Sequence, residues 1–389
     1  MQYRRLGKTN EEISILGFGA MRLPVIDKDT TKINEEEATK MLRYSIDQGV
    51  NYVDTAFPYH GNDMSTPGQS EPFVGRALKD GYREKVKIAT KLPTWLMESR
   101  EQMDEVLDGQ LERLQTDCVD FYLVHTINKQ FWPKAMELGI FDFLEKAKKA
   151  GKIGHIGFSY HDNPQYFKEV IDAYDWEFCQ IQYNYLDVEF QAGRTGLEYA
   201  ASKDIGVIIM EPLRGGSLVN NLPKEILDIF AEAEEKKTPA EWALRWLWND
   251  KNVGLVLSGM STMEQVEENV EVASKALPAS LSEKELSIID RAQEFFRSKL
   301  KVNCTKCRYC MPCPVGVNIP ENFTLYNSLH LTGDVQHSSI MYNMFLSQEE
   351  KASGCVECGK CEEHCPQEIK IVDELKNVVA TFEKPEEEA

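Results

Sequence analysis

Eight of the ten cysteines of this 389-residue chain lie between Cys304 and Cys365, in two tight groups. The first group reads Cys-Thr-Lys-Cys-Arg-Tyr-Cys-Met-Pro-Cys-Pro, and the second reads Cys-Val-Glu-Cys-Gly-Lys-Cys-Glu-Glu-His-Cys-Pro. This is not the spacing of a disulfide framework. Where thiols stay reduced, cysteines two residues apart are typical metal ligands, because short loops let several thiolates converge on one centre. This part of the chain is therefore expected to fold around metal.

The second group matches the bacterial ferredoxin run Cys-x2-Cys-x2-Cys-x3-Cys-Pro residue for residue. In that run three thiolates bind one 4Fe-4S cluster, and the fourth, followed by proline, binds the other cluster. We therefore expect two 4Fe-4S clusters with crossed ligand sets. The first set is Cys304, Cys307, Cys310 and Cys365, and the second set is Cys355, Cys358, Cys361 and Cys313.

The first group departs from the ferredoxin pattern, because only two residues precede its fourth cysteine and a long segment, residues 314–354, separates the groups. Residues 318–323 and 338–345 within that segment have helical patterns, so the domain resembles an α-helical ferredoxin. A zinc site is the alternative, since four thiolates can also bind zinc. Zinc needs two cysteine pairs, whereas each group here has four cysteines and a trailing proline, so the pattern favours clusters.

Short apolar runs alternate with amphipathic stretches over the first two thirds of the chain. The eight apolar runs are residues 17–23, 51–56, 86–92, 119–125, 152–159, 177–184, 206–211 and 253–259. Helical patterns between them include residues 34–49, 97–115, 141–151 and 263–274. Such alternation predicts a parallel sheet, and eight units predict a closed (β/α)8 TIM barrel. The two remaining cysteines, Cys118 and Cys179, lie in apolar runs and are interpreted as small buried hydrophobic residues.

Polar residues end three of these apolar runs. In a parallel barrel the chemistry gathers at the C-terminal ends of the strands. Asp54 ends the second run, Lys91 the third and His125 the fourth, while Tyr59 lies in the loop after the second. Any one of them alone is more often structural than catalytic, so their order along the chain carries the argument.

With these four residues in this order, the chain resembles the aldo-keto reductases over about residues 1–300. Further matching motifs are Gly17-Phe-Gly-Ala-Met-Arg-Leu, Asp54-Thr-Ala-Phe-Pro-Tyr, Ser70-Glu71, Gly157-Phe-Ser and Gly259-Met-Ser-Thr-Met-Glu-Gln-Val-Glu-Glu-Asn. With its cysteine-rich tail it resembles the ferredoxin-fused branch of that family. The expected domains are a barrel over residues 1–300 and a mostly helical ferredoxin-like domain over residues 301–389.

The resemblance implies a catalytic tetrad of Asp54, Tyr59, Lys91 and His125. A phenol with a reference pKa of ~10 donates a proton poorly at neutral pH unless a neighbouring ammonium lowers that pKa, as Lys91 is placed to do. Asp54 would hold the lysine, and His125 would orient the carbonyl oxygen while hydride reaches the carbon.

The resemblance also implies nicotinamide contacts. Ser159 and Gln180 match residues that hold the nicotinamide amide, although Tyr160 replaces the usual asparagine. Met210 stands where many members stack an aromatic ring on nicotinamide. A pyrophosphate loop is expected at Leu213, Arg214, Gly215 and Gly216. For Arg214, a solvated surface charge is an equal alternative.

Members that prefer NADPH clamp its 2′-phosphate with a Lys and an Arg near the last strand. Aligned through Glu268 and Asn269, those positions are Gly259 and Gln265 here, so we expect NADH to be favoured. No fingerprint of a separate flavin domain is present, which leaves open a flavin in the barrel mouth.

The composition excludes some functions. Lys and Arg total 44 against 63 Asp and Glu, and a net charge of −19 repels nucleic acid and anionic membrane surfaces. No window approaches the length of a membrane span, and the N-terminus has no apolar segment of a secretion signal, so a cytoplasmic protein is expected.

Two functions from different classes remain. The first is an oxidoreductase that reduces a carbonyl, or oxidises the matching alcohol, with a nicotinamide cofactor and a small-molecule substrate. The second is an electron-transfer module whose clusters pass electrons to a partner protein while the barrel binds a ligand without hydride chemistry. Substrate, direction of reaction and oligomeric state cannot be read from residue types.

Overall fold

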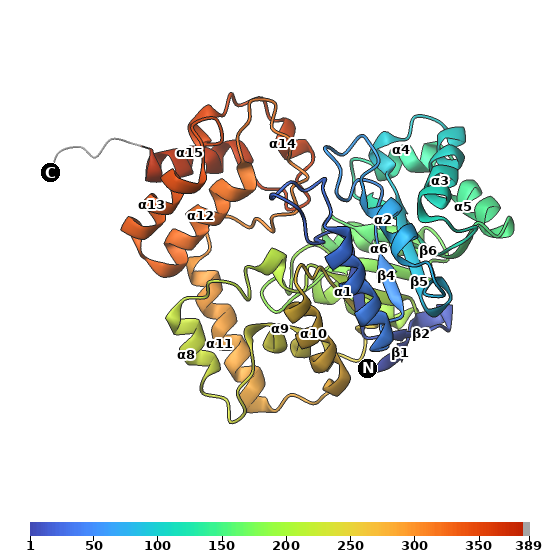
Figure 1. Cartoon of the computed structure of the whole chain (residues 1–389), viewed down its shortest axis with the longest axis horizontal. Helices are drawn as coiled ribbons and strands as arrows, with labels where there is room; N and C mark the ends of the chain where they lie inside the picture. Colours follow the sequence, from blue (N-terminus) through green and yellow to red (C-terminus); the bar gives the residue numbers. More distant parts are fainter. Residues whose placement is uncertain (384–389) are drawn as a thin grey trace. The chain divides into compact units, whose positions relative to one another are not determined.

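The computed structural model describes residues 1–383, apart from the side chains at positions 336, 337 and 345. The chain forms two compact units (Figure 1). The barrel unit comprises Met1–Leu213 and Thr238–Ser282, and the cysteine unit comprises Arg214–Lys237 and the chain from Glu283 onward. The division into domains at residue 300 stays a prediction.

Eight parallel strands close into a barrel, as predicted. In chain order, which is also their order around the barrel, they are β3 (Leu16–Gly19), β4 (Tyr52–Asp54), β5 (Lys87–Leu92), β6 (Val119–Ile127), β7 (Ile153–Tyr160), β8 (Phe178–Gln182), β9 (Gly206–Met210) and β10 (Leu255–Ser258). A hairpin of β1 (Tyr3–Arg5) and β2 (Glu12–Ser14) precedes them. Its Leu6 and Ile13 complete the apolar core inside the barrel. Because the interior is packed, a functional site is expected at the C-terminal ends of the strands.

Helices of the barrel unit follow the strands in the alternation that the sequence predicts. They are α1 (Glu35–Asp47), α2 (Ser70–Ala77), α3 (Arg100–Leu114), α4 (Trp132–Glu137), α5 (Ile140–Lys149), α6 (Pro164–Asp172), α7 (Gly193–Ser202), α9 (Pro239–Asn249) and α10 (Met263–Lys275). Several begin at a residue whose side chain accepts a hydrogen bond from the first turn, such as Ser99, Thr238 and Thr262. These caps satisfy otherwise unpaired backbone N–H groups and fix where each helix starts.

The cysteine unit is helical, as predicted. Its helices are α8 (Lys224–Phe230), α11 (Glu283–Lys299), α12 (Ile319–Thr332), α13 (Val335–Phe345), α14 (Lys360–Glu363) and α15 (Ile371–Phe382). The core of its C-terminal part includes Phe323, Tyr342 and Leu375. Six of the eight cysteines are partly buried against this core, whereas Cys358 is exposed.

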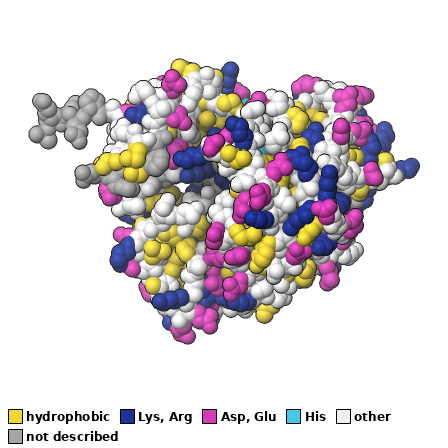
Figure 2. Space-filling view, viewed as in Figure 1, with side chains coloured by type: hydrophobic (Ala, Val, Ile, Leu, Met, Phe, Trp, Pro, Cys, Tyr) yellow, Lys and Arg dark blue, Asp and Glu magenta, His cyan; other side chains and the backbone are white. Residues whose placement is uncertain are grey.

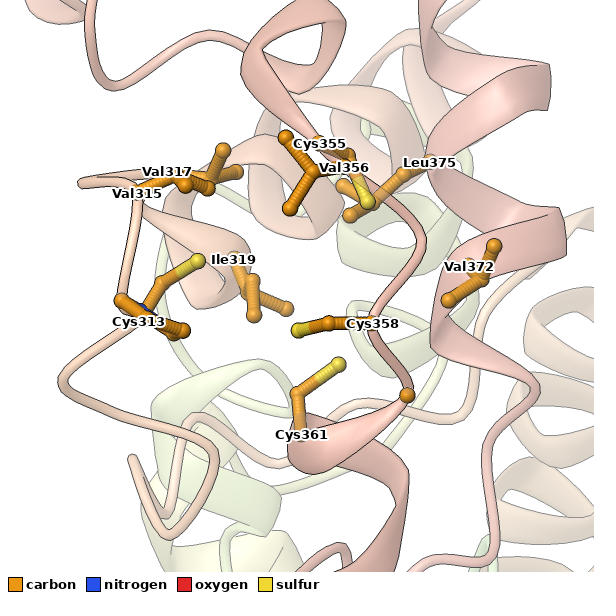
Figure 3. A pocket seen from close by; sticks show the side chains of 12 residues that line it. Cys313, Val315, Val317, Ile319, Cys355, Val356, Cys358, Cys361, Val372 and Leu375 are labelled. Atoms are coloured by element: carbon orange, nitrogen blue, oxygen red, sulfur yellow. The ribbon is translucent and has the colours of Figure 1, made fainter.

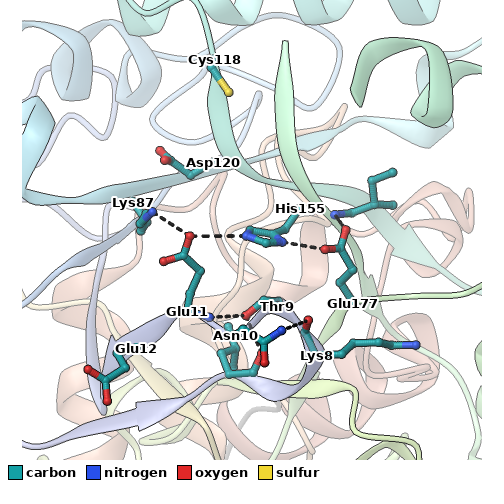
Figure 4. Close-up of polar contacts among 12 residues, drawn as sticks. Lys8, Thr9, Asn10, Glu11, Glu12, Lys87, Cys118, Asp120, His155 and Glu177 are labelled. Carbon is teal, nitrogen blue, oxygen red and sulfur yellow. Dashed lines mark hydrogen bonds and ion pairs between the residues drawn. The ribbon is translucent and has the colours of Figure 1, made fainter. Parts of the chain in front are cut away.

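A polar network lies at the end of the barrel where the strands begin (Figure 4). His155 Nδ1 lies 2.7 Å from Glu177 Oε1, and its other ring nitrogen lies 3.6 Å from Glu11 Oε1. Lys87 Nζ donates to Glu11 Oε1 at 2.8 Å. Because the chemistry of such barrels lies at the opposite end, where the strands finish, these contacts of His155 have a structural role.

No helix within residues 1–383 combines the length and the apolar character that a bilayer span requires. On the face drawn in Figure 2, Lys and Arg side chains are interspersed with Asp and Glu.

Candidate functional site

The period of two along each strand places three of the predicted site residues inside the barrel. On each of three neighbouring strands, a residue of the interior core is followed two places later by a polar residue at the C-terminal end. The pairs are Tyr52 and Asp54 on β4, Ala89 and Lys91 on β5, and Leu123 and His125 on β6. Because alternate side chains of a strand face the same side, all three polar groups point into the barrel mouth.

Lys91 and Asp54 form a buried ion pair. Lys91 Nζ donates to Asp54 Oδ1 at 2.8 Å and Oδ2 at 2.7 Å, and also to the backbone oxygen of Thr55 at 2.7 Å. The Lys91 side chain has no exposed surface. Burial raises the pKa of Asp54 and lowers the pKa of Lys91, while the ion pair opposes both shifts. The pair holds a cation at a fixed point in the mouth.

Tyr59 lies directly above this cation. Lys91 Nζ is 5.0 Å from the centre of the Tyr59 ring, and the rings of Tyr59 and His125 are 6.4 Å apart at a steep angle. Burial, and then the charge of Lys91, lowers the pKa of His125 well below its ordinary value. His125 is therefore neutral near pH 7 and can donate one hydrogen bond without carrying a charge. The structure brings all four predicted tetrad residues together.

A second layer of polar side chains supports Lys91 from behind. Gln110 Nε2 donates to the backbone oxygen of Lys91 at 3.0 Å and to Glu71 Oε1 at 2.8 Å. Thr90 also donates to Glu71, and Arg113 Nε donates to its other oxygen at 2.7 Å. The sequence motif pointed to Glu71, but Gln110 and Arg113 lie on α3, far along the chain, and no local pattern marks them.

Two residues near His125 were also missed. Trp95 lies in the loop after β5, and the centre of its ring is 5.1 Å from that of His125. Thr126, the next residue after His125, has φ of 55° in the left-handed region, which is strained for a β-branched side chain. Its backbone N–H donates to Ser159 Oγ at 2.8 Å, where β6 and β7 shift register. Backbone strain of this kind has no signature in residue types.

The predicted nicotinamide-amide residues are neighbours at the same rim. Ser159 on β7 pairs in register with Gln180 on β8, and Gln180 Nε2 lies 3.5 Å from Met210 Sδ on β9. The side-chain oxygen of Gln180 is buried and has no hydrogen-bond partner among the described residues. An unpaired buried acceptor is costly, so this oxygen fits the amide N–H of a bound ligand.

Tyr160, which replaces the family's asparagine, does not line this mouth. Its ring packs against Phe158 and Phe167 in the outer core, and its hydroxyl donates to the backbone oxygen of Asn163 at 2.6 Å. The substitution therefore strengthens the wall between β7 and α6.

The remaining predicted cofactor residues fall in different places. Asn269 on α10 donates to Ser258 Oγ at 3.0 Å, and Gln265 accepts from the backbone N–H of Ser261 at 2.9 Å. Gly259 lies against the aliphatic part of Arg22, since a Cβ there would come within 3.3 Å of that side chain. Arg22 is a nearby cation that the alignment did not point to. Leu213 belongs to the barrel unit.

Arg214 and Gly216 belong to the cysteine unit, in the short helix η4 (Arg214–Gly216). Only 2% of Arg214 is exposed, and its guanidinium donates to the side-chain oxygen of Asn303. The interpretation of Arg214 as a solvated surface charge is therefore wrong.

The second cysteine set lines one pocket. Figure 3 shows the sulfurs of Cys313, Cys355, Cys358 and Cys361 around a common space, closed by apolar side chains such as Ile319 and Leu375. The four thiolates come from two loops that are far apart in sequence. The pocket therefore brings Cys313 to the same space as the three cysteines of the later loop, and the binding of one cluster by these four stays a prediction.

The first set gathers in a similar way. Burial raises the pKa of the Cys310 thiol, and the neighbouring thiols of Cys307, Cys304 and Cys365, together with Cys361 of the second set, add to that effect. The loops of the two sets fold alike: Lys306 and Glu357 have φ of 57° and 56°, and each donates its backbone N–H to the sulfur of the cysteine two places earlier, at 3.4 Å.

Within the described residues, no three His, Cys, Asp or Glu side chains are arranged to hold a single metal ion. The thiolates of a 4Fe-4S cluster bind separate irons and need not meet at one point. Of the other two cysteines, Cys179 is buried and Cys118 half-buried.

Comparison with known proteins gives matches for both units. Residues 15–294 match the Aldo/keto reductase family, and residues 303–369 match a 4Fe-4S dicluster domain. The chain is 27% identical to L-galactose dehydrogenase of Arabidopsis thaliana, over 76% of this chain and 95% of that protein. It is 27% identical to Protein tas of Escherichia coli, over 76% and 99%.

Among solved structures, the holo form of aldo-keto reductase AKR11C1 from Bacillus halodurans superposes with a TM-score of 0.61 at 27% identity. That match covers 75% of this chain and 96% of the other.

Proposed function

Because the chain belongs to the aldo/keto reductase family and is an oxidoreductase with a 4Fe-4S domain, we propose that its barrel reduces a small-molecule carbonyl, or oxidises the matching alcohol, with a nicotinamide cofactor. The observation that carries this proposal is the Asp54–Lys91 ion pair, which holds its cation beneath the ring of Tyr59. A positive charge beside a phenol makes it a stronger acid.

In this proposal Tyr59 donates the proton that the carbonyl oxygen acquires. Lys91 keeps the developing phenolate stable, and Asp54 keeps Lys91 charged in a buried site. Neutral His125 donates a hydrogen bond to the same carbonyl oxygen. Tyr59 and His125 together therefore stabilise the negative charge that develops on that oxygen. The ring of Trp95 lies beside that of His125, where it would limit the access of water to the reacting carbonyl.

The bound nicotinamide supplies the hydride. The residues fit such a cofactor at its amide, because the unpaired oxygen of Gln180 can accept the amide N–H. Ser159 and Met210 adjoin it on the neighbouring strands. Around the position of the family's phosphate clamp, Gly259 offers no charge and Gln265 caps α10, which supports a preference for NADH.

For the cysteine unit we propose two 4Fe-4S clusters, one for each cysteine set. The gathering of each set within the unit and the matching fold of the two loops support this pairing. Cys358 is exposed, and so are Val315 and Val356 at the same pocket. An exposed ligand favours exchange of single electrons with an outside redox protein over a purely structural role.

The variant Tyr59→Phe tests the proposed chemistry, because it removes the proton donor and keeps the ring over Lys91. Carbonyl turnover should fall ~10²- to 10⁴-fold while nicotinamide binding, followed by fluorescence, changes little. The matched control is Tyr52→Phe, which loses a buried hydroxyl of the barrel interior and should keep its turnover. Unchanged turnover in Tyr59→Phe would remove Tyr59 from the mechanism.

Flavin content should be measured on the same samples, since nicotinamide passes two electrons at once and a cluster passes one. If turnover never needs Tyr59 and nicotinamide does not bind, the second candidate function stands: an electron-transfer module whose barrel binds a ligand.

A further inference from the structure

The two cysteine sets have similar loops but different electrostatic surroundings. Beside the first set, at Cys304, lie the side chains of Arg214 and Lys306, both positive. The carboxylate of Glu362 acts on Cys361 of the second set and also on Cys365 of the first, and the ammonium of Lys376 interacts with Cys355 of the second set, so the buried Arg214 is the charge that distinguishes the first set. Glu357 occupies in the second loop the place that Lys306 has in the first.

Arg214 is tied to the first set at two points of the chain. Its guanidinium donates to Asn303, the residue before Cys304. Asn303 in turn donates to Gln367 Oε1 at 3.3 Å, and Gln367 lies two residues after Cys365. Cys304 and Cys365 are the first and the last of the eight clustered cysteines, so this chain of hydrogen bonds links the two segments that complete the first set.

The guanidinium of Arg214 is buried next to the first cysteine set. Arg214 is 2% exposed and Gln367 is 6% exposed, so solvent screens the guanidinium weakly. Its hydrogen-bond partner Asn303 directly precedes Cys304, which places this fixed positive charge close to a ligand of the first set.

Reduction of a cluster adds one electron and therefore one negative charge. A fixed cation nearby stabilises the reduced form and raises the reduction potential, whereas a carboxylate lowers it. Hydrogen bonds to sulfur also tune potentials, but the backbone N–H to sulfur bond described above is the same in both loops.

We propose that Arg214 sets the reduction potential of the first cluster, held by Cys304, Cys307, Cys310 and Cys365, above that of the second cluster. The inference rests on the proposed cluster sites. With both clusters bound, this order of potentials would favour transfer of one electron from the reduced second cluster, whose ligand Cys358 is exposed, to the oxidised first cluster.

The test is an anaerobic potentiometric titration with dithionite, followed by the electron paramagnetic signal. The parental protein should show two midpoint potentials. Arg214→Gln should shift the higher midpoint to a more negative value and leave the lower one in place, while Arg214→Lys, which keeps the charge, should stay close to the parental protein. The control Arg291→Gln removes a charge of the same unit at an exposed ion pair with Glu232 and should shift neither midpoint.

If the Arg214→Gln protein is purified without iron, the same titration is made on Gln367→Glu. A carboxylate in the same hydrogen-bond network should also lower the higher midpoint potential. If the iron-containing variant, Arg214→Gln or Gln367→Glu, has the same two midpoint potentials as the parental protein, the inference about Arg214 is wrong, although the proposed cluster sites still stand. A parental protein without iron would instead overturn the proposed cluster sites, and this inference with them.

Discussion

The barrel unit and the cysteine unit place their functional side chains by different means. In the barrel, Asp54, Lys91 and His125 end neighbouring strands, and Lys91 is fixed by Asp54 and by Gln110. In the cysteine unit, the ligands lie on loops such as the one from Cys304 to Cys313, and six of the eight cysteines pack against a small core. A site on strands is therefore complete in the folded chain, whereas a site on loops depends on what it binds.

The largest effect that tests this contrast comes from breaking the barrel's own ion pair. Lys91→Met leaves the carboxylate of Asp54 buried and unpaired, which should cost ~3–5 kcal/mol of unfolding free energy and abolish turnover. The double variant with Asp54→Asn should recover most of that stability without recovering turnover. Chemical denaturation followed by circular dichroism measures both.

The matched control is Lys85→Met, at an exposed pair with Asp47, which should stay within ~1 kcal/mol of the parental protein. The iron content and the cluster spectrum should be the same in all these variants. If Lys91→Met protein lost its iron, the stability of the cysteine unit would depend on the ion pair in the barrel unit.

The second effect is removal of the clusters. Because the cysteines pack into the core of their unit, iron loss should release protection from hydrogen exchange in α12 and α15 and leave β4, β5 and β6 protected. Exchange measured by mass spectrometry on anaerobic protein, with and without its clusters, checks this. If α12 and α15 were equally protected from hydrogen exchange in both samples, the small apolar core would be enough to keep the unit folded without its clusters.

A smaller effect concerns the opposite end of the barrel. Burial disfavours the charge of Glu177, but hydrogen bonds from His155, Lys148 and the backbone of Ile156 outweigh it and lower its pKa to about 2. Since the folded pKa lies below the unfolded one, Glu177 stabilises the fold above pH ~4.5, and this stabilisation is lost as pH falls toward 2.

Glu177→Gln should therefore cost ~2 kcal/mol at pH 7 and progressively less below pH ~4.5, with turnover unchanged. Paired denaturation curves at several pH values measure the difference. A cost that does not depend on pH would show that the ionisation of Glu177 is not what stabilises this end of the barrel.

The smallest effect is cofactor preference. NADH should serve at least as well as NADPH, and Gln265→Arg should raise kcat/KM for NADPH ~10-fold with little change for NADH, because it adds a cation that a 2′-phosphate can pair with. Steady-state kinetics of the parental protein and the variant, each with NADH and with NADPH, measure this preference. A strong parental preference for NADPH would point to Arg22 as the cation that replaces the missing clamp.

The sequence predicted the barrel and the helical cysteine unit because both rest on local patterns: alternating strands and helices in one, fixed cysteine spacing in the other. Asp54, Lys91 and His125 could be identified because each ends an apolar run. Trp95, Gln110 and Thr126 could not, because their roles come from contacts between distant segments or from backbone strain.

The burial of Arg214 could not be read from the sequence. Its place after β9 allowed a solvated side chain, but that side chain is buried against Asn303, 89 residues further along the chain, while its contact with a pyrophosphate stays a prediction. Side-chain direction in a loop depends on packing that residue type does not encode. Tyr160 is a similar case, since its alignment pointed to the nicotinamide pocket and its ring packs outward.

We propose that hydride passes directly between nicotinamide and carbonyl in the barrel mouth. This transfer is tested most directly with NADH that carries deuterium at the transferred position, incubated anaerobically in ordinary water with a carbonyl substrate found by screening. One deuterium should appear on the carbonyl carbon of the product, in the parental protein and equally in Cys358→Ser protein that lacks the second cluster. A product that contains only hydrogen from water, or turnover that disappears with the cluster, would contradict it.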